Sequence, residues 1–135
     1  MTRDELHQIP ARDREIQQAK ARLASLQARA ESTEIQYEER VQSSGGAGRE
    51  AYMAEAADTE REIEALAQLQ AKAKVRARDL IEGISDQEYE ARQIKKVLRY
   101  RYLHCWTWEA IAEATCYSYR WTQRLARKGE ELLFD

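Results

Sequence analysis

The chain has 135 residues and a formal net charge of −2, so its length suits one ordinary domain or two small ones. Alanine, glutamate, lysine, leucine and arginine make up 72 of these residues, a composition typical of long helices and coiled coils. One proline and five glycines leave little turn material for a many-stranded sheet, so an all-α protein without a large core or a deep pocket is expected.

Several classes of protein are not expected from this sequence. No apolar stretch approaches the roughly 20 residues of a membrane span, and the N-terminus lacks the apolar core of a signal peptide, so we expect a cytoplasmic protein without membrane contacts. Cys105 and Cys116 have no second pair, and together with His104 they lack a standard ligand spacing, so neither a disulfide framework nor a metal site is predicted. No nucleophile–base–acid set is present, so we predict no enzyme and no cofactor.

Residues 1–84 are predicted to form two long helices. The first begins near Thr2, whose spacing to Glu5 is that of a capping box, and Pro10 is expected to kink or restart it. Apolar residues recur at spacings of three and four along both helices, which predicts an apolar seam on each. The first seam comprises Ile9, Ile16, Ala19, Leu23, Leu26, Ala30 and Tyr37, and the second comprises Ala56, Thr59, Ile63, Leu66, Gln70, Ala73, Ala77, Leu80 and Ile84.

A stretch rich in serine and glycine separates the two helices, and residues 41–50 are predicted to form a flexible loop. A long helix with a narrow apolar stripe is unstable alone and must pack on another helix. The sequence therefore predicts a long antiparallel helical hairpin, similar to a coiled coil, over residues 1–84. We expect it to be a spacer and oligomerisation arm that makes the protein a homodimer.

Residues 85–135 are predicted to form a second, denser domain, because nine of the eleven aromatic residues lie in the last 47 positions. Gly83 ends the second helix, and Ser85 and Glu88 have capping-box spacing at the start of a third helix that runs from Asp86 to about Leu103. The buried face of this helix is expected to comprise Tyr89, Ile94, Val97, Leu98 and Tyr102.

Two further helices are predicted after a break at residues 104–106. Thr107 is the expected N-cap of a short helix over residues 108–114, and Ser118 is the expected cap of a last helix after a tight turn. The last helix should bury Thr122, Leu125 and Leu132. Trp106, Trp108 and Tyr102 are expected in the core, whereas Trp121 could pack on the third helix, meet DNA or contact a partner protein.

A short helix, a tight turn and a capped longer helix have the spacing of a helix-turn-helix, whose second helix enters the DNA major groove. Residues 92–128 carry a net charge of +7, whereas residues 1–91 carry −6. Arginine can pair with guanine and glutamine with adenine, and the basic residues of the third helix suit phosphate contacts. The predicted DNA-binding residues are Tyr119, Arg120, Gln123, Arg124, Arg127, Lys128, Thr107 and Ser118.

This C-terminal segment resembles region four of bacterial sigma factors. The resemblance rests on Leu98, on Arg101-Tyr102-Leu103, on the run from Thr107 to Glu113, and on Tyr117-Ser118. The wider chain resembles a family of small phage and prophage proteins of unassigned function, in which two long helices joined at a stretch like Val41–Gly45 precede a sigma-like helix-turn-helix. The resemblance implies an all-helical fold, a role in phage transcription and a contact with RNA polymerase. It also implies that Tyr119, Arg120, Gln123 and Arg124 occupy base-reading positions.

The sequence departs from the sigma-like pattern at four positions. Cys105 and Cys116 stand where such sequences usually have glycine, and Thr122 stands at a position that is usually apolar. Gly129 replaces the common alanine, which is expected to cost the last helix about 1 kcal/mol and to favour an early helix end.

The function that this sequence favours is a sequence-specific, DNA-binding regulator of transcription of phage or prophage type. Two alternatives stay open at this point. One is a DNA-packaging protein similar to a small terminase subunit, although such proteins usually place the helix-turn-helix before the oligomerising helices. The other is an adaptor that binds protein partners, with the basic face incidental.

Overall fold

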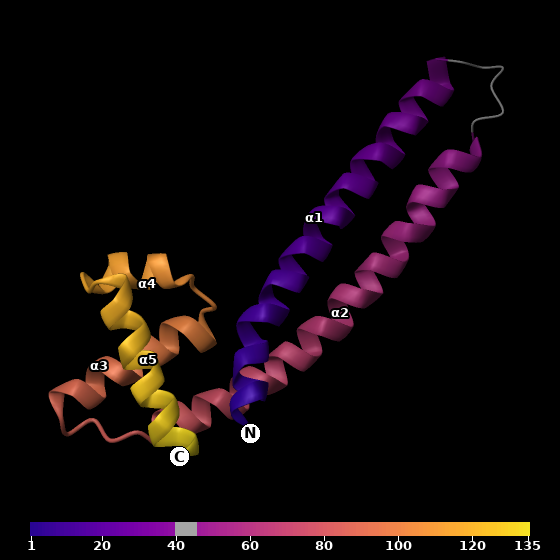
Figure 1. The fold of residues 1–135 in the computed structure, drawn as a ribbon. Coiled ribbons are helices and arrows are strands. Elements are labelled where there is room, and N and C mark those ends of the chain that lie inside the picture. The colour runs from indigo at the N-terminus through magenta and orange to yellow at the C-terminus, as the bar shows by residue number, and fades with distance from the viewer. Residues whose placement is uncertain (40–45) are drawn as a thin grey trace. The chain divides into compact units, whose positions relative to one another are not determined.

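The computed structural model describes the backbone of residues 1–39 and 46–135 and the side chains of residues 1–32 and 48–135. Helices joined by turns are the only regular secondary structure in the described residues, so the all-α prediction is confirmed (Figure 1). The elements are α1 (Arg3–Glu39), α2 (Gly46–Glu82), α3 (Tyr89–Leu98), the π-helical turn η1 (Arg99–Leu103), α4 (Trp108–Thr115) and α5 (Tyr119–Phe134).

The chain divides into two compact units, and α1 and α2 contribute to both. Unit 1 comprises Met1–Asp13 and Leu69–Asp135, and unit 2 comprises Arg14–Gln68. This division differs from the boundary at residue 84 that the sequence suggests. The difference has a physical cause, because the first turns of α1 and the last turns of α2 carry side chains that belong to the core of unit 1.

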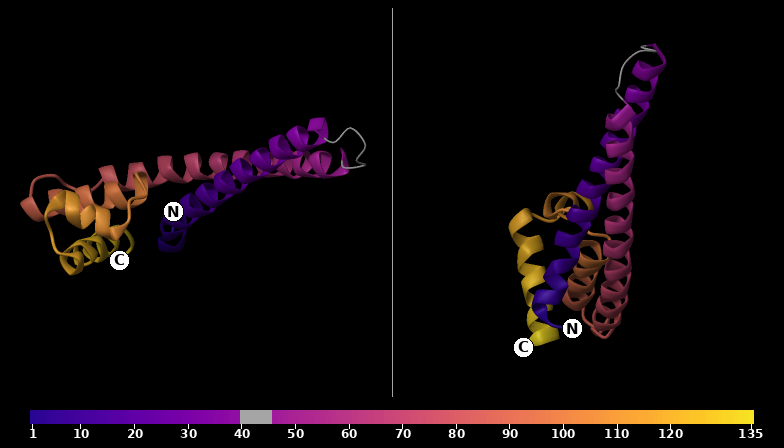
Figure 2. Two further views of the ribbon diagram at one scale, coloured as in Figure 1. Left: turned by 90° about the horizontal axis from the view of Figure 1, so that it is seen from above. Right: turned by 90° about the vertical axis from the view of Figure 1, so that its right-hand side faces the viewer.

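In unit 2, the described parts of α1 and α2 lie side by side and run in opposite directions (Figures 1 and 2). Ile16, Ala19 and Leu26 of α1 and Ala56 and Thr59 of α2 are buried, as the predicted seams require. The rest of the described seam in this unit is half-buried and comprises Leu23, Ala30, Ile63 and Leu66. Small residues and partial burial make this a thin contact, which one exposed cross-helix ion pair supplements at 3.3 Å between Arg22 Nη1 and Glu62 Oε2.

Two predictions for these helices need correction. The helix α2 already begins at Gly46, so residues 46–50 are helical and not part of the predicted loop. Pro10 lies inside α1, which runs on as one helix, so the expected restart is wrong and the expected kink stays a prediction. The predicted loop residues 41–45 and the side chain of Tyr37 lie outside the described residues.

The first turn of α1 has the predicted capping box. The backbone N–H of Glu5 donates to Thr2 Oγ1, and the backbone N–H of Thr2 donates to Glu5 Oε2, both at 3.2 Å. Farther along, the buried amide of Gln70 donates from Nε2 to the Ile9 carbonyl at 2.8 Å and accepts from Arg12 Nη1 at 3.1 Å. Gln70 therefore fills a seam position with its polar atoms paired, as burial of an amide requires.

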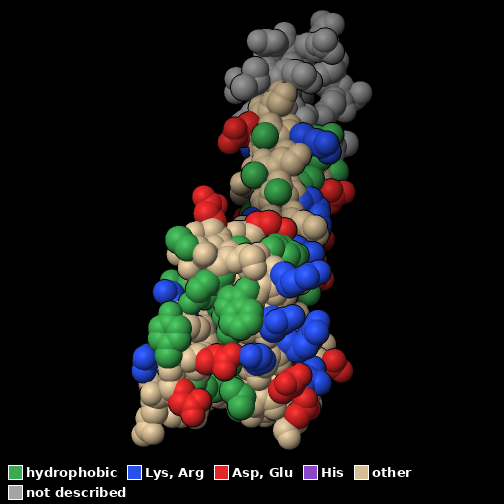
Figure 3. Space-filling view, turned by 60° about the vertical axis from the view of Figure 1, so that its left-hand side comes forward, with side chains coloured by type: hydrophobic (Ala, Val, Ile, Leu, Met, Phe, Trp, Pro, Cys, Tyr) green, Lys and Arg blue, Asp and Glu red, His purple; other side chains and the backbone are tan. Residues whose placement is uncertain are grey.

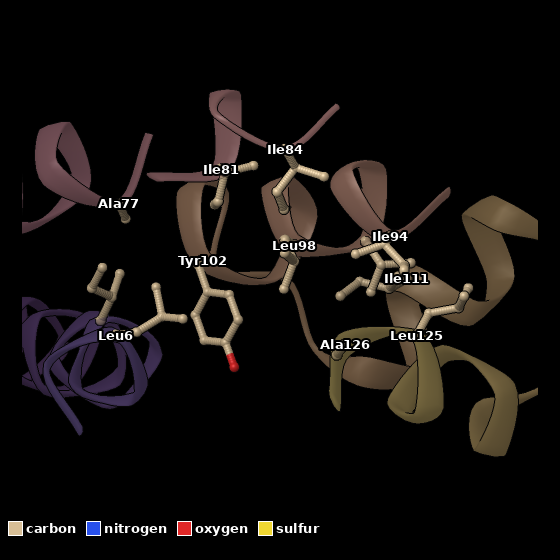
Figure 4. Close-up of a cluster of buried hydrophobic side chains, with 12 residues drawn as sticks. Leu6, Ala77, Ile81, Ile84, Ile94, Leu98, Tyr102, Ile111, Leu125 and Ala126 are labelled. Atoms are coloured by element: carbon tan, nitrogen blue, oxygen red, sulfur yellow. The ribbon is translucent and has the colours of Figure 1, made fainter. Parts of the chain in front are cut away.

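The core of unit 1 gathers side chains from all five α-helices and from η1 (Figure 4). The helices α1 and α2 supply Leu6, Ile9, Ala77 and Ile81, about a third of the buried cluster, and all four lie outside the predicted C-terminal domain. The remaining members of the cluster are Ile84, Ile94, Val97, Leu98, Tyr102, Ile111, Leu125 and Ala126. A segment of some 50 residues has little apolar area to bury, and the ends of the two long helices supply the missing part.

The third predicted helix differs from expectation at its start. It begins at Tyr89 and not at Asp86, and its N-cap residue Glu88 makes no side-chain cap hydrogen bond. Ser85 Oγ instead accepts from the Gln87 backbone N–H at 3.3 Å, so the predicted capping box is wrong. Tyr89 is 68% exposed and is not part of the buried face, whereas Ile94, Val97, Leu98 and Tyr102 are buried as predicted.

Gly129 lies where α5 crosses α3. A Cβ at this position would lie 2.7 Å from Leu98 Cδ1 and 2.8 Å from Ile94 Cγ2, so only glycine allows this approach. The expected early helix end is therefore wrong, because α5 continues to Phe134. Leu132 was expected in the core but is 62% exposed. The buried positions of α5 are Thr122, Leu125, Ala126 and Gly129.

Candidate nucleic-acid interface

The helices α4 and α5 are both capped as the sequence predicts. Thr107 Oγ1 accepts from the Ala110 backbone N–H and Ser118 Oγ accepts from the Trp121 backbone N–H, each at 3.1 Å. Each cap satisfies one of the backbone donors that a helix start leaves unpaired. The two hydroxyl oxygens therefore have a structural task, and their predicted contact with DNA stays a prediction.

The two cysteines adopt the backbone conformation that glycine usually takes. Cys105 has φ 56° and Cys116 has φ 59°, both in the left-handed region. Cys116 follows the last residue of α4 and turns the chain toward Ser118, so a left-handed residue is required for this short connection. Cys105 and Cys116 therefore keep the left-handed backbone conformation of the glycines that they replace in the sigma-like pattern. This conformation costs each of them about 1 kcal/mol in backbone strain.

The solvent-facing side of α5 carries three arginines at spacings of four and three, Arg120, Arg124 and Arg127, which we name the arginine face. All three side chains are exposed, because Thr122, Leu125, Ala126 and Gly129 turn the opposite side of the helix into the core. Within the described part of the chain, the arginine face has no carboxylate partner at ion-pair distance. Three cations without carboxylate partners on one rigid helix make a ready contact for a polyanion.

The other predicted DNA-binding side chains of α5 flank the arginine face. Tyr119 is 45% exposed, and Gln123 is half-buried in a shallow hollow that His7, Tyr102 and Glu130 also line. Lys128 Nζ pairs with Glu90 Oε1 at 2.6 Å, so part of its charge is already neutralised. The structure therefore brings six of the eight predicted residues together on α5, and Thr107 and Ser118 stand at the helix starts.

The first turns of α1 are attached to the C-terminal half of α5. His7 Nε2 contacts Glu130 Oε1, and the Tyr102 hydroxyl donates to the same oxygen at 2.8 Å. Burial and the Glu130 carboxylate raise the pKa of Tyr102, so this hydroxyl stays a donor. Arg3 Nη2 pairs with Asp135 Oδ2 at 2.9 Å at the end of the same helix. Residues 1–13 thus help to hold α5 in place, a role that the sequence did not indicate.

Most basic side chains of α3 and η1 are engaged within the fold. Lys95 is 3% exposed, and its Nζ lies 3.0 Å from Asp86 Oδ1, so it cannot contact phosphate. Arg99 donates to Glu82 Oε1 at 2.8 Å, and this hydrogen bond lowers the pKa of the Glu82 carboxyl. Arg92 and Lys96 keep exposed side chains, and Arg92 Nη1 also donates to the Asp86 carbonyl at 3.0 Å. The predicted phosphate contacts from this region therefore reduce to these two side chains.

The aromatic residues divide between core and surface. Tyr102 is buried and Trp108 is half-buried under the Arg101 guanidinium, whose carbon lies 4.6 Å from its ring centre. Trp106 was expected in the core but is 38% exposed, with its ring stacked on Tyr100 at a centroid distance of 4.5 Å. The π-helical turn η1 and the left-handed Cys105 carry the chain around to this stack, and neither is visible in the spacing of apolar residues.

The described residues contain no group of three or more histidine, cysteine or acidic side chains that could hold a metal ion. In the same part of the chain, no helix has the length and apolar character needed to cross a bilayer. Comparisons of the chain with protein-family models, with curated proteins and with solved structures give no match.

Proposed function

We propose that this protein is a sequence-specific, double-stranded DNA-binding regulator of transcription, with α5 as its recognition helix. The observation that carries the proposal is the arginine face, which stands on a capped helix fixed from behind by a fully buried core face. A helix that is held rigidly loses little backbone entropy when its side chains meet a ligand, so the geometry suits specific binding.

In the recognition step, α5 would enter the major groove of the duplex, which is wide enough to admit one α-helix. The N-terminal turns of α5 would present Tyr119, Arg120, Gln123 and Arg124 to the base edges, where arginine pairs with guanine O6 and N7 and glutamine with adenine N6 and N7. Arg127 and Lys128 stand farther along the helix and suit phosphate contacts, which set register without reading sequence. The N-caps Thr107 and Ser118 would place their helix starts near the backbone.

Three features of the proposal come from the sequence alone. The sigma-like motif suggests a contact with RNA polymerase, and the resemblance to phage and prophage proteins suggests a role in phage transcription. The apolar seams of α1 and α2 suggest a homodimer through residues 1–84. A dimer would suit an operator with two half-sites, because the spacing of the half-sites mirrors the symmetry of the protein.

Selection of bound sites from random duplex DNA tests the proposal directly. We expect one enriched motif, and an affinity for it that falls with salt at a slope near −3.6 per log unit if about four phosphates are contacted. The double variant Arg120→Ala/Arg124→Ala should abolish the enrichment. The charge-matched control Arg14→Ala/Arg61→Ala, in unit 2, should retain it.

Failure of folded protein to enrich any motif would contradict the proposal. If RNA polymerase is captured equally by the wild type and by the Arg120→Ala/Arg124→Ala variant while neither binds DNA, the adaptor alternative is favoured. A ring-sized assembly in light scattering would favour a packaging role instead of a regulator.

A further inference from the structure

A second surface of unit 1 combines one exposed and two half-buried aromatic rings with cations, and it adjoins the arginine face through Arg124. Its six residues come from the start of α3, from the turn before α5 and from α5 itself, and we name it the aromatic–basic surface. Its members are Tyr89, Arg92, Tyr117, Trp121, Arg124 and Lys128. Figure 3 shows one face of the molecule on which hydrophobic side chains, aromatic rings among them, lie beside lysine and arginine side chains.

Two of its three rings lie under a cation. The Arg92 guanidinium carbon is 5.8 Å from the Tyr89 ring centre, and Lys128 Nζ is 5.4 Å from the Trp121 ring centre. The Arg124 guanidinium carbon lies over the same indole at 5.9 Å. These are distances at which a cation is attracted to the face of an aromatic ring. The rings and the cations are therefore held together in one place and not scattered over the surface.

Contacts between α3 and α5 hold the surface together. The ion pair from Lys128 to Glu90 joins the first turn of α3 to α5, and the Tyr117 hydroxyl contacts Gln93 Oε1. Burial raises the pKa of the Tyr117 hydroxyl, and the neighbouring Tyr89 raises it further. One carboxylate, that of Glu90, is thus paired within a group that carries three cations.

The exposure of the Tyr89 ring is not explained by the core. Tyr89 is 68% exposed although the periodicity of α3 would allow it to be buried, and Trp121 is half-buried at the edge of the cluster. A large aromatic side chain in water is typical of a binding surface. The accompanying cations indicate an anionic partner, and an anion with flat rings of its own would use both kinds of side chain.

Bases in a duplex are stacked on each other, so their flat faces are closed to a protein side chain. Bases in a single strand are open, and proteins bind them by stacking on aromatic rings while basic residues follow the phosphates. We propose that the aromatic–basic surface binds unpaired nucleotides of a single-stranded nucleic acid. Arg92 and Lys128 would move from the ring faces to the phosphates, and bases would stack on the faces of Tyr89 and Trp121 that these cations leave. This activity goes beyond duplex reading by α5 and does not require it.

The test measures binding of the full-length protein to two labelled probes by fluorescence anisotropy at low salt. One probe is an oligothymidylate of about 12 nucleotides, and the other is a blunt duplex that carries the selected motif. We expect Trp121→Leu and Tyr89→Leu each to weaken oligothymidylate binding about tenfold, because each removes one stacked base. Trp121→Phe retains a ring and should bind nearly as the wild type does. The matched control Trp106→Leu removes an exposed ring outside this surface and should have no effect.

Several results would overturn the proposal. The first is that the wild-type protein does not bind oligothymidylate. The second is that the Tyr89→Leu and Trp121→Leu variants bind it as tightly as the wild type does. Because Tyr89 is largely exposed, its replacement tests the surface even if Trp121→Leu fails to fold. Unchanged binding in both variants would favour a protein partner for this surface.

The two proposals fail separately. The double variant Arg120→Ala/Arg127→Ala should lose duplex binding and keep oligothymidylate binding, since neither residue belongs to the aromatic–basic surface. A wild-type protein that binds oligothymidylate through Trp121 but never binds duplex would remove the regulator proposal and leave this one standing.

Discussion

The two units use the same pair of helices in different ways. In unit 2, α1 and α2 meet along a seam in which small residues such as Ala19 and Ala56 alternate with leucine and isoleucine, several of which are only half-buried. In unit 1, the ends of the same helices contribute Leu6 and Ile81, both fully buried, to a core that also holds side chains from α3, η1, α4 and α5. Each of the two helices therefore packs only against the other over part of its length, and contributes side chains to the core of a small domain over the rest.

This comparison shows why a domain boundary read from composition can differ from one based on packing. The C-terminal 51 residues have the aromatic side chains of a small domain, but a chain of that length buries too little surface to be comfortably stable. The ends of α1 and α2 supply the missing apolar area. All three tryptophans lie in unit 1, so their fluorescence reports the unfolding of that unit, whereas helical circular dichroism reports both units.

The largest expected effect comes from truncating the N-terminal contribution to the core of unit 1. Leu6→Ala should lower the free energy of unfolding by about 3 kcal/mol, since it leaves a cavity in a fully buried site. Urea unfolding followed by tryptophan emission measures this change. Leu23→Ala, at a half-buried position in unit 2, is the matched control and should change the tryptophan transition by less than about 1 kcal/mol. Equal small effects would mean that residues 1–13 are not part of the core.

Gly129→Ala should destabilise unit 1 by about 2 kcal/mol, although alanine favours helices by about 1 kcal/mol over glycine. The added methyl group would overlap Leu98 and Ile94, which are buried and have little room to move. The matched control Gly48→Ala, at an exposed helical position in α2, should have the opposite sign and stabilise its helix. Thermal unfolding of both variants would decide this, and a more stable Gly129→Ala protein would contradict the tight crossing of α3 and α5.

Removing the partner of a buried cation should cost more than removing an exposed ion pair. Asp86→Ala leaves the buried Lys95 ammonium without its closest carboxylate and should cost about 1.5 kcal/mol, moderated because Asp86 itself is partly exposed. Asp58→Ala breaks the exposed pair with Arg61 in unit 2 and should cost less than about 0.5 kcal/mol. Denaturant unfolding of the two variants side by side provides the measurement. Similar values would show that Lys95 finds solvent or another partner.

The smallest expected effect concerns the turn before α5. Cys116→Gly should stabilise unit 1 by roughly 0.5–1 kcal/mol, because glycine adopts the left-handed conformation without strain. The gain is limited because glycine also has more conformational freedom in the unfolded chain. Cys116→Ala keeps the strained conformation and serves as the control, with no stabilisation expected. A shift in melting temperature for glycine alone would confirm the strain at this turn.

Sequence periodicity predicted the helical elements and most buried seam positions, because spacings of three and four place side chains on one helix face whatever the tertiary context. The caps at Thr2, Thr107 and Ser118 were predictable for the same reason, since each depends on neighbours only a few residues away. The capping box expected at Ser85 and Glu88 failed although it is a local pattern, whereas the wrong burial predictions depend on distant partners. Leu132 and Tyr89 have apolar character but meet no core side chain that would bury them.

The candidate site was predictable only in part. Its arginines follow from the amphipathic pattern of α5, where Thr122 and Leu125 mark the inward side. Two features arise only where α3 meets its neighbours, and no local pattern encodes them. Lys95 is held in an ion pair with Asp86 and is not available to a phosphate, and Tyr89 and Trp121 belong to one surface.

By itself, the sequence determined that this protein is helical, that its large side chains and its positive charge gather toward the C-terminus, and where three of its helices begin. These properties depend on composition and on residues within a turn or two of each other. Only the tertiary structure decided that α1 and α2 complete the core of unit 1, that Gly129 permits the crossing of α3 and α5, and which cations face solvent. Burial and pairing depend on which surfaces meet, and residues far apart in the chain decide that together.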